Sequence, residues 1–281
     1  MTFSLMTQSW RFFALNTLFT VLLFFASSQH LYAENSKERF SYPLLGYRVS
    51  NTYPHDTTLF TQGFTLDDRN TLFESGGGYG KSVIIKRTLS KLQPLGKTVL
   101  PPGVFAEGLT LLDDRLYLAT WKSGKIHVFD QSLNKQSAHN LPCEMWGLTS
   151  DNKNLIMSNG SEHLFFLKPE TMEITKKLEV TRQNEVMRNL NELEWVDGFV
   201  FANIWHSNEI IVIDTDNGKV IGTLDLTGLD DTSLSQVHEE AVLNGIAWQK
   251  DTSRLLVTGK YWSTIYEIEL DSGLPARRQS R

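Results

Sequence analysis

The chain is short of cysteine, and this limits how its fold can be held together. Only one of its 281 residues is cysteine, Cys143, so no disulfide can form within the chain. The fold must therefore depend on side-chain packing and backbone hydrogen bonds. No basic residue stands beside Cys143, and we interpret it as a small buried apolar residue rather than a catalytic thiol.

Two further absences exclude whole classes of function. Lys and Arg number 27 against 32 Asp and Glu, a net charge of -5, and the basic residues are scattered except in the tail at 276–281. Proteins that bind nucleic acid usually carry a basic patch, so no nucleic-acid partner is expected. The seven histidines show none of the spacings of a zinc site, so no catalytic metal is expected.

The chain also lacks an apolar run of the roughly 20 residues that a transmembrane helix needs. The longest run, residues 12–26, has 15 residues; Arg11 precedes it, and small and polar residues follow up to Ala33. This layout predicts a secretory signal peptide over residues 1–33. The protein is then exported, periplasmic or secreted, with no stable membrane association after cleavage. An uncleaved N-terminal membrane anchor is the alternative.

What the chain has instead is an internal repeat. A polar or aromatic residue, a small or apolar pair, a turn rich in Asp, Asn and Gly, and an apolar strand recur five times. With Gly63, Gly108, Gly147, Leu193 and Gly245 taken as equivalent, the spacings are 45, 39, 46 and 52 residues. Units of about 40 to 50 residues with several short strands are typical of propeller blades.

The pattern inside a repeat agrees with this interpretation. Residues 114–121 and 125–130 alternate or are rich in β-forming residues, and a hairpin turn joins them. Only residues 182–195 suggest helix, of one or two turns. We therefore predict an all-β fold, a single five-bladed β-propeller over residues 45–270 followed by a C-terminal tail at 271–281. A two-layer β-sandwich is the alternative.

The first residue of each repeated phrase indicates a site. In a propeller the innermost strands line the central axis, and the loops at their ends meet at one mouth of the channel. These lead residues would then surround one cavity: Gln62, Glu107, Trp146, Asn191 and Asn244. One carboxylate, several amides and an aromatic ring are the composition of a binding site. A buried carboxylate is costly unless it is paired or functional.

Six segments, in a fixed order, carry a resemblance to a known family. They read "FTQGF", "ESGGGYGKS", "FAEGLTLLDDRLYLATWKSG", "EMWGLTSDNKNLIMSNGS", "NELEWVDGFVFANIW" and "NGIAWQKDTSRLLVTGKYW". Together they resemble the glutaminyl-peptide cyclotransferases of the plant and bacterial type. The resemblance implies a five-bladed propeller that converts the N-terminal glutamine of peptides and proteins into pyroglutamate and releases ammonia.

The resemblance also implies the residues of the site. The reaction needs a group that takes a proton from the attacking α-amine and returns one to the departing ammonia. Glu107 stands at the position of the family's catalytic glutamate, and burial among aromatic rings would raise its pKa as this role requires. The expected substrate-binding residues are Gln62, Asn191, Lys260, Phe60, Phe105, Trp121, Trp146 and Trp205. For Trp248 and Trp262 packing between blades is the expected role.

Two positions depart from the family pattern: Asn159 replaces a common aspartate, and Ala106 replaces a frequent glycine. No cofactor is required for the reaction, but related plant enzymes imply a structural calcium ion on the propeller axis or in an acidic loop. A monomer is expected. Two other functions stay open. One is a non-catalytic propeller that binds a peptide or a sugar in the same pocket; the other is a calcium-dependent lactonase-type hydrolase built on Glu107, Asn191 and Asn244.

Overall fold

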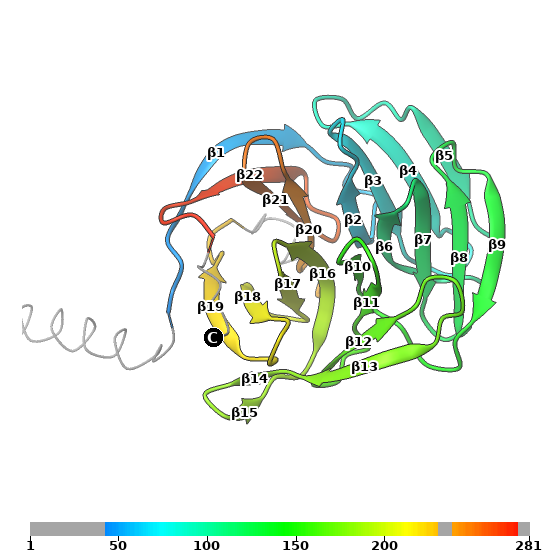
Figure 1. Ribbon diagram of the computed structural model, residues 1–281. Helices are drawn as coiled ribbons and strands as arrows, with labels where there is room; N and C mark the ends of the chain where they lie inside the picture. The colour runs from blue at the N-terminus through cyan, green and yellow to red at the C-terminus, as the bar shows by residue number, and fades with distance from the viewer. Residues whose placement is uncertain (1–42, 230–237, 275–281) are drawn as a thin grey trace, which may run out of the picture. The chain divides into compact units, whose positions relative to one another are not determined.

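The computed structural model describes residues 43–229 and 238–274 (Figure 1). The expected signal peptide at 1–33 and residues 275–281 of the expected tail lie outside these ranges. From Leu44 on, the described residues belong to one unit, whose regular elements are all strands. No helix with the length and hydropathy of a membrane span occurs in the described part of the chain.

The strands form five four-stranded antiparallel sheets, and the prediction of a five-bladed β-propeller is confirmed. The first three sheets are β2–β5 (Thr61–Leu66, Thr71–Gly76, Val83–Thr88, Gly96–Val99), β6–β9 (Ala106–Leu112, Arg115–Thr120, Lys125–Asp130, Lys135–Asn140) and β10–β13 (Leu148–Ser150, Leu155–Met157, His163–Leu167, Ile174–Glu179). The fourth is β16–β19 (Leu190–Val196, Phe199–Ile204, Glu209–Asp214, Val220–Asp225), preceded by the short hairpin β14–β15 (Thr181–Arg182, Glu185–Val186). The fifth joins β20–β22 (Leu243–Gln249, Arg254–Gly259, Thr264–Leu270) to β1 (Tyr47–Pro54).

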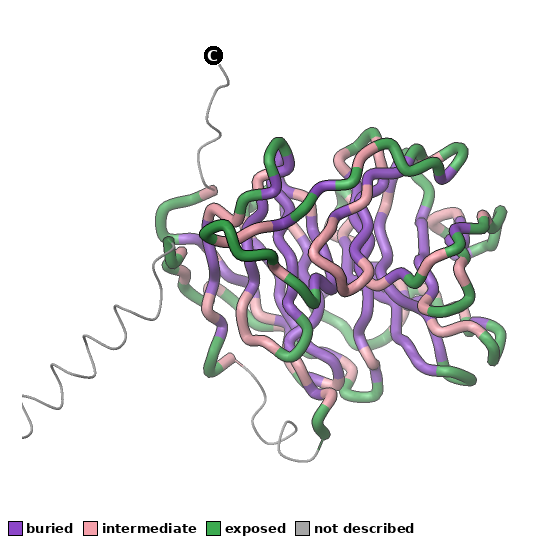
Figure 2. Tube along the Cα trace, turned by 90° about the horizontal axis from the view of Figure 1, so that it is seen from below, coloured by how far each residue is buried: buried purple, intermediate pink, exposed green. Residues whose placement is uncertain are grey.

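One end strand of each sheet lies innermost; in the fifth sheet, whose order is β1-β22-β21-β20, this strand is β20. Strands β2, β6, β10, β16 and β20 contact one another in turn around the centre of the ring (Figure 1). Burial falls from the inner strand to the outer one: β6 is buried at nearly every position, whereas β9 is mostly exposed. The buried residues accordingly run through the middle of the blades, with exposed residues at turns and outer strands (Figure 2).

The ring is closed without a covalent bond. Strand β1, from the beginning of the described chain, pairs antiparallel with β22 from its end and completes the fifth blade. At the next seam, between the fifth blade and the first, Phe64 and Leu72 of the first blade pack with Leu256 and Ile265 of the fifth. Backbone pairing and packing thus hold the ends of a chain that has only one cysteine.

The predicted alignment of the five repeats is wrong by one residue in the fourth repeat. Leu109 pairs with Leu118 after the irregularity in β6, and Leu193 pairs with Ala202 at the same point in β16. Leu193 therefore matches Leu109, and the residue that corresponds to the repeated glycine is Glu192. The error arose because the fourth repeat has no glycine to align.

The helical turns suggested for residues 182–195 are also wrong. This segment contains the β14–β15 hairpin and the first residues of β16. Gln183, Asn184 and Asn189 have positive φ values of 55°, 68° and 62°, which an α-helix does not allow. The polar residues that looked like an exposed helix face are turn residues.

Trp262 has the packing role expected of it. Its side chain is 1% exposed and lies in the apolar core between the fourth and fifth blades. Its indole Nε1 donates to the carbonyl oxygen of Ala241 over 3.3 Å. Cys143 is only partly buried and packs beside the core of the second and third blades, and burial raises the pKa of its thiol.

Candidate active site

The inner strands turn their lead residues toward one end of the channel. Strands β2, β6, β16 and β20 each carry a shift of register at the lead residue, as a β-bulge does, and bulges commonly re-aim a side chain. A glycine after the lead residue lets neighbouring blades approach. A Cβ atom at Gly108 would lie 2.3 Å from the backbone nitrogen of Leu148, and one at Gly63 would lie 2.2 Å from that of Leu109.

Hydrogen bonds from blade to blade hold these bulges in place. They pass around the ring as Ser75 Oγ to Glu107 O (2.6 Å), Gly108 N to Trp146 O (2.6 Å), Ser158 Oγ to Asn191 O (2.7 Å), Gly245 N to Asn203 Oδ1 (2.9 Å) and Asn244 Nδ2 to Thr61 O (2.8 Å). Three of them end on the backbone carbonyl of a lead residue. The direction of a lead side chain thus depends on the blade next to it.

All nine residues predicted for the site line one pocket of about 350 Å³. Its lining comes from all five blades: Phe60, Gln62, Phe105, Glu107, Trp121, Trp146, Asn191, Trp205, Glu240 and Lys260. A volume of this size lies at the small end of ligand sites and suits one compact group. The structure brings the predicted residues together, and their individual roles stay predictions.

Asn244 is the exception among the lead residues. It does not line the pocket but lies fully buried behind it, where its Nδ2 donates to the backbone oxygen of Thr61 and to Gln62 Oε1 at 3.3 Å. Asn244 therefore supports Gln62 from behind. The expectation that it faces the cavity is wrong, because its amide spans the junction between the fifth and first blades.

Glu107 is the buried carboxyl of the pocket. Burial raises its pKa well above the ordinary value for glutamate; the positive charge of Lys260 and a hydrogen bond from Gln62 oppose this rise, whereas the negative charge of Glu144 adds to it. A carboxyl in this setting holds a proton at pH values where an exposed glutamate has lost it. It can therefore both give and take a proton at higher pH than an exposed glutamate can.

Lys260 is the cation nearest to this chemistry. It is 3% exposed, and its Nζ lies 4.4 Å from the centre of the Phe60 ring and 3.7 Å from Glu240 Oε2. Burial lowers the pKa of Lys260, while Glu107 and Glu240 raise it again. Lys260 thus provides a buried N–H donor between two carboxyl groups.

The pocket walls are aromatic and contact one another. Phe105 lies 6.1 Å from Phe60 and 5.3 Å from Trp121, measured between ring centres, and Trp146 lies 5.6 Å from Trp205. The glycine run before β4 makes room for this packing, since a Cβ atom at Gly77 would lie 2.5 Å from the Phe105 ring. Gly77 of this run therefore packs closely against a pocket wall, whereas a Cβ atom at Gly80 would meet nothing within 4 Å.

Sequence reasoning missed three residues at this site. Glu240 lines the pocket, Glu144 accepts hydrogen bonds from the indoles of Trp121 and Trp146, and the Tyr79 ring lies 5.4 Å from that of Phe105. Glu144 was within reach of inference, because it stands two residues before a predicted pocket tryptophan. No repeat pattern marks Glu240 or Tyr79.

Asn159, where the family commonly has aspartate, lies outside the pocket lining. Its Oδ1 accepts hydrogen bonds from Ser161 Oγ at 2.6 Å and Ser161 N at 3.2 Å, so the side chain stabilises its own turn. The next residue, Gly160, packs against the Trp146 ring, from which a Cβ atom would be 2.7 Å away. Asn159 therefore bears on the pocket only through the support of Trp146.

The residues considered for a lactonase-type metal site are not assembled. Glu107 and Asn191 line the pocket, but Asn244 is engaged with Thr61 and Gln62. Within residues 43–229 and 238–274, no three His, Cys, Asp or Glu side chains are grouped so that they can hold a metal ion.

Comparison with known proteins gives a consistent result along the whole propeller. A family described as glutamine cyclotransferase matches residues 21–270. The chain is 39% identical over 224 residues to the glutaminyl-peptide cyclotransferase of Arabidopsis thaliana, which covers 78% of this chain and 69% of the relative. The crystal structure of Myxococcus xanthus glutaminyl cyclase matches with a TM-score of 0.76 and 32% identity, over 82% of this chain and 98% of that one.

Proposed function

The chain belongs to the glutamine cyclotransferase family, and we propose that Glu107 moves the protons when it cyclises N-terminal glutamine. Its activity is that of a glutaminyl-peptide cyclotransferase, and its substrates are peptides and proteins that begin with glutamine. One observation carries the role of Glu107: it is a buried carboxyl in a small pocket with five aromatic side chains and one lysine.

The reaction takes place within one residue of the substrate. The α-amine nitrogen attacks the δ-carbon of the side-chain amide, a new C–N bond closes the five-membered lactam, and the bond to the amide nitrogen breaks to release ammonia. Because both reacting groups belong to the same molecule, the enzyme has chiefly to hold them in the closing geometry. The aromatic walls suit this task, since they enclose a compact group and exclude water.

Glu107 supplies the proton transfers. It takes the proton that the amine nitrogen loses as the ring closes, and it delivers a proton to the amide nitrogen, which leaves as ammonia. One carboxyl serves for both steps, so no net proton is consumed by the enzyme. A pKa raised by burial brings the carboxyl close to the working pH, where acid-base catalysis is most effective.

The polar residues around Glu107 bind the parts of the glutamine that carry charge in the transition state. We assign Gln62 and Asn191 to the substrate amide and amine. Lys260 Nζ is a buried donor suited to the oxygen of the tetrahedral intermediate, because a charge-assisted hydrogen bond gains strength where water is excluded. Removal of such a donor typically costs about 100-fold or more in kcat.

The test is ammonia release from a Gln-initiated dipeptide amide at neutral pH, with wild type beside Glu107→Gln. The substitution keeps the size of the side chain and removes the proton carrier, so kcat should fall about 100-fold or more. Binding of the substrate should change much less, since the pocket walls remain. Equal turnover in both proteins would remove Glu107 from the mechanism, and a folded wild type without turnover would favour a peptide- or sugar-binding propeller.

We also propose the propeller axis as the place of the structural calcium that the family resemblance implies. Glu192 extends from the fourth blade to accept the backbone N–H of Ile246 in the fifth at 2.8 Å and that of Phe64 in the first. Its other oxygen, Oε1, has no hydrogen-bond partner among the described residues. Glu194 lies nearby, and a free carboxylate oxygen is a ligand that calcium prefers, so the remaining ligands at this place would have to be water.

Export and a monomeric state complete the proposal. The apolar run at 12–26 and the small residues before Ala33 support a cleaved signal peptide. All ten residues that line the pocket come from one chain, so the site needs no second copy. N-terminal sequencing of the exported protein and its mass in solution test these two points. An intact N-terminus or a dimer mass would contradict them.

A further inference from the structure

Glu144 connects two walls of the pocket. It lies between β9 and β10, and its carboxylate is exposed at the surface. Its Oε1 accepts the indole N–H of Trp146 at 2.9 Å and also that of Trp121. Trp121 follows β7 in the second blade and Trp146 precedes β10 in the third, so one oxygen atom joins side chains of two blades.

These two hydrogen bonds orient the indole rings of Trp121 and Trp146. Each indole has a single N–H donor, and a bond from it restricts the positions that the ring can take. Both rings are only partly buried, so packing alone leaves them freedom to turn. Their neighbours follow them: Phe105 lies against Trp121 at 5.3 Å, and Trp205 lies against Trp146 at 5.6 Å. Glu144 therefore contacts two of the five aromatic walls directly, and two more through their rings.

The charge of Glu144 acts on the catalytic carboxyl as well. Burial raises the pKa of Glu107, Lys260 and Gln62 lower it, and Glu144 raises it further. Glu240, which lines the pocket, is engaged with Lys260, whereas Glu144 lies outside the lining. Glu144 is thus the group on the second and third blades that offsets the influence of Lys260 from the fifth.

We propose that Glu144 is a positioning residue for the cyclisation. Its carboxylate holds Trp121 and Trp146 as walls around the substrate glutamine, and its negative charge opposes that of Lys260 at the Glu107 carboxyl. The inference rests on the proposed role of Glu107. It assigns to one exposed residue both the shape of the pocket and part of its electrostatics.

Two substitutions separate the two effects. Glu144→Gln keeps an oxygen that accepts both indole N–H groups but removes the charge, so KM should stay within about twofold of wild type. Glu144→Ala removes both bonds, and KM should rise about tenfold, the effect of losing roughly 1.4 kcal/mol of hydrogen bonding. Glu173→Gln, at an exposed pair with Lys168 in the third blade, is the control and should match wild type.

The pH profile is the measurement that a merely structural role would not change. In a plot of kcat/KM against pH, one limb follows the amine of the substrate and shifts with substrates of different amine pKa. The other limb reports Glu107. Both Glu144 variants should move this second limb to lower pH, because a nearby negative charge that raises the pKa of Glu107 has been removed. Glu173→Gln should leave it in place.

Binding measured by intrinsic tryptophan fluorescence gives an outcome that does not need turnover. With a pyroglutamyl peptide as the probe, Glu144→Ala should bind about tenfold more weakly than wild type, and Glu144→Gln should bind like wild type. Equal affinity in all three proteins overturns the role of Glu144 as a clamp. An unmoved Glu107 limb in an active Glu144→Gln overturns its electrostatic role. Absence of ammonia release from wild type bears on the proposed function instead.

Discussion

Three fully buried glutamates show that partners, not burial alone, decide the state of a carboxyl. Burial would raise the pKa of Glu74, but His55, Arg87 and Thr61 together hold it below its usual value. Burial and the nearby Glu144 carboxylate raise the pKa of Glu107. Lys260 lowers it, but not enough, and the pKa stays well above the usual range. Glu192 has backbone N–H groups and a neighbouring glutamate, and its pKa is also raised. The lowered pKa of Glu74 suits a structural ion pair, and the raised pKa of Glu107 suits proton transfer.

Glu192 carries the prediction for calcium. If a cation binds at the axis, it favours the charged form of Glu192 beside Glu194, and it stabilises the folded state by RT ln(1 + [Ca²⁺]/Kd). A chelator should therefore lower Tm by several degrees, and added calcium should restore it. In Glu192→Gln the chelator should have little effect. A wild-type Tm that is indifferent to chelator and calcium would contradict the axial site.

Among the elements, the inner strands do most to build the pocket. Their bulges aim the lead residues, glycines let the blades approach, and a short polar side chain of one blade reaches the backbone of the next. Ser75 in β3 is the clearest case, since its hydroxyl bonds the carbonyl oxygen of Glu107 itself. The site is therefore positioned by residues that never touch the substrate.

Ser75→Ala tests whether a strand of one blade positions Glu107 of the next. The substitution leaves the buried carbonyl of Glu107 without its donor, which costs about 1–3 kcal/mol of stability. A small displacement of Glu107 should also reduce kcat about tenfold or more with little change in KM. Thr98→Val is the matched control: its hydroxyl also bonds a carbonyl of the next blade, Leu133 O at 3.1 Å, but away from the pocket. Equal kcat in the two variants would contradict the positioning role.

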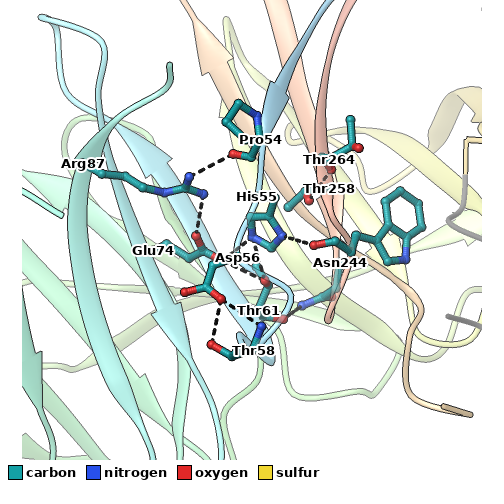
Figure 3. A network of polar contacts seen from close by, with 11 residues as sticks. Pro54, His55, Asp56, Thr58, Thr61, Glu74, Arg87, Asn244, Thr258 and Thr264 are labelled. Carbon is teal, nitrogen blue, oxygen red and sulfur yellow. Dashed lines mark hydrogen bonds and ion pairs between the residues drawn. The ribbon is translucent and has the colours of Figure 1, made fainter. Parts of the chain in front are cut away.

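For the whole molecule, the decisive feature is the closure between the fifth blade and the first. A buried polar network lies at this seam (Figure 3). His55 contacts Trp262 O at 2.7 Å and Glu74 Oε1 at 2.8 Å, Thr61 Oγ1 donates to the same oxygen at 2.7 Å, and Arg87 lies 3.3 Å from Glu74 Oε2. Thr61 directly precedes Gln62 in β2, so adjacent residues of one strand join the closure to the pocket.

Removal of Glu74 should therefore damage folding and catalysis together. Glu74→Ala leaves Arg87 and His55 buried without their carboxylate, and breaking a buried pair in this way costs about 3–5 kcal/mol. Arg48→Ala is the control at the β1–β22 pairing, since Arg48 and Glu269 form an exposed pair at 2.7 Å worth about 1 kcal/mol or less. Urea unfolding measures the loss in the free energy of unfolding for each of the two variants. Similar losses in the two variants would contradict the role of the buried network.

The same network predicts how stability depends on pH. Because the pKa of Glu74 is lower in the folded state, its contribution is fully present above the pKa of the unfolded chain and is lost as pH falls through the folded value. Tm should therefore decline from about pH 4.5, the ordinary glutamate value, downward. Glu74→Gln should flatten this decline relative to wild type.

The sequence by itself determined the architecture and most of the pocket. Five repeats of similar length cannot bury their apolar strands alone, so they predict a ring of blades, and the residues at the head of each repeat must then meet. This reasoning brought Glu107, Gln62 and Asn191 to one place. It failed by one residue at Leu193, where the guiding glycine is missing, and at the polar turns in 182–195.

Only the tertiary structure decided what each side chain meets. Asn244 has the same place in its repeat as Glu107, yet its amide turns to Thr61 and Gln62 instead of the cavity. Glu144 became part of the site because the indoles of two different blades reach one carboxylate oxygen. A repeat pattern records which strand a residue belongs to. Contacts across the seams depend on how neighbouring blades pack, and no single repeat contains that information.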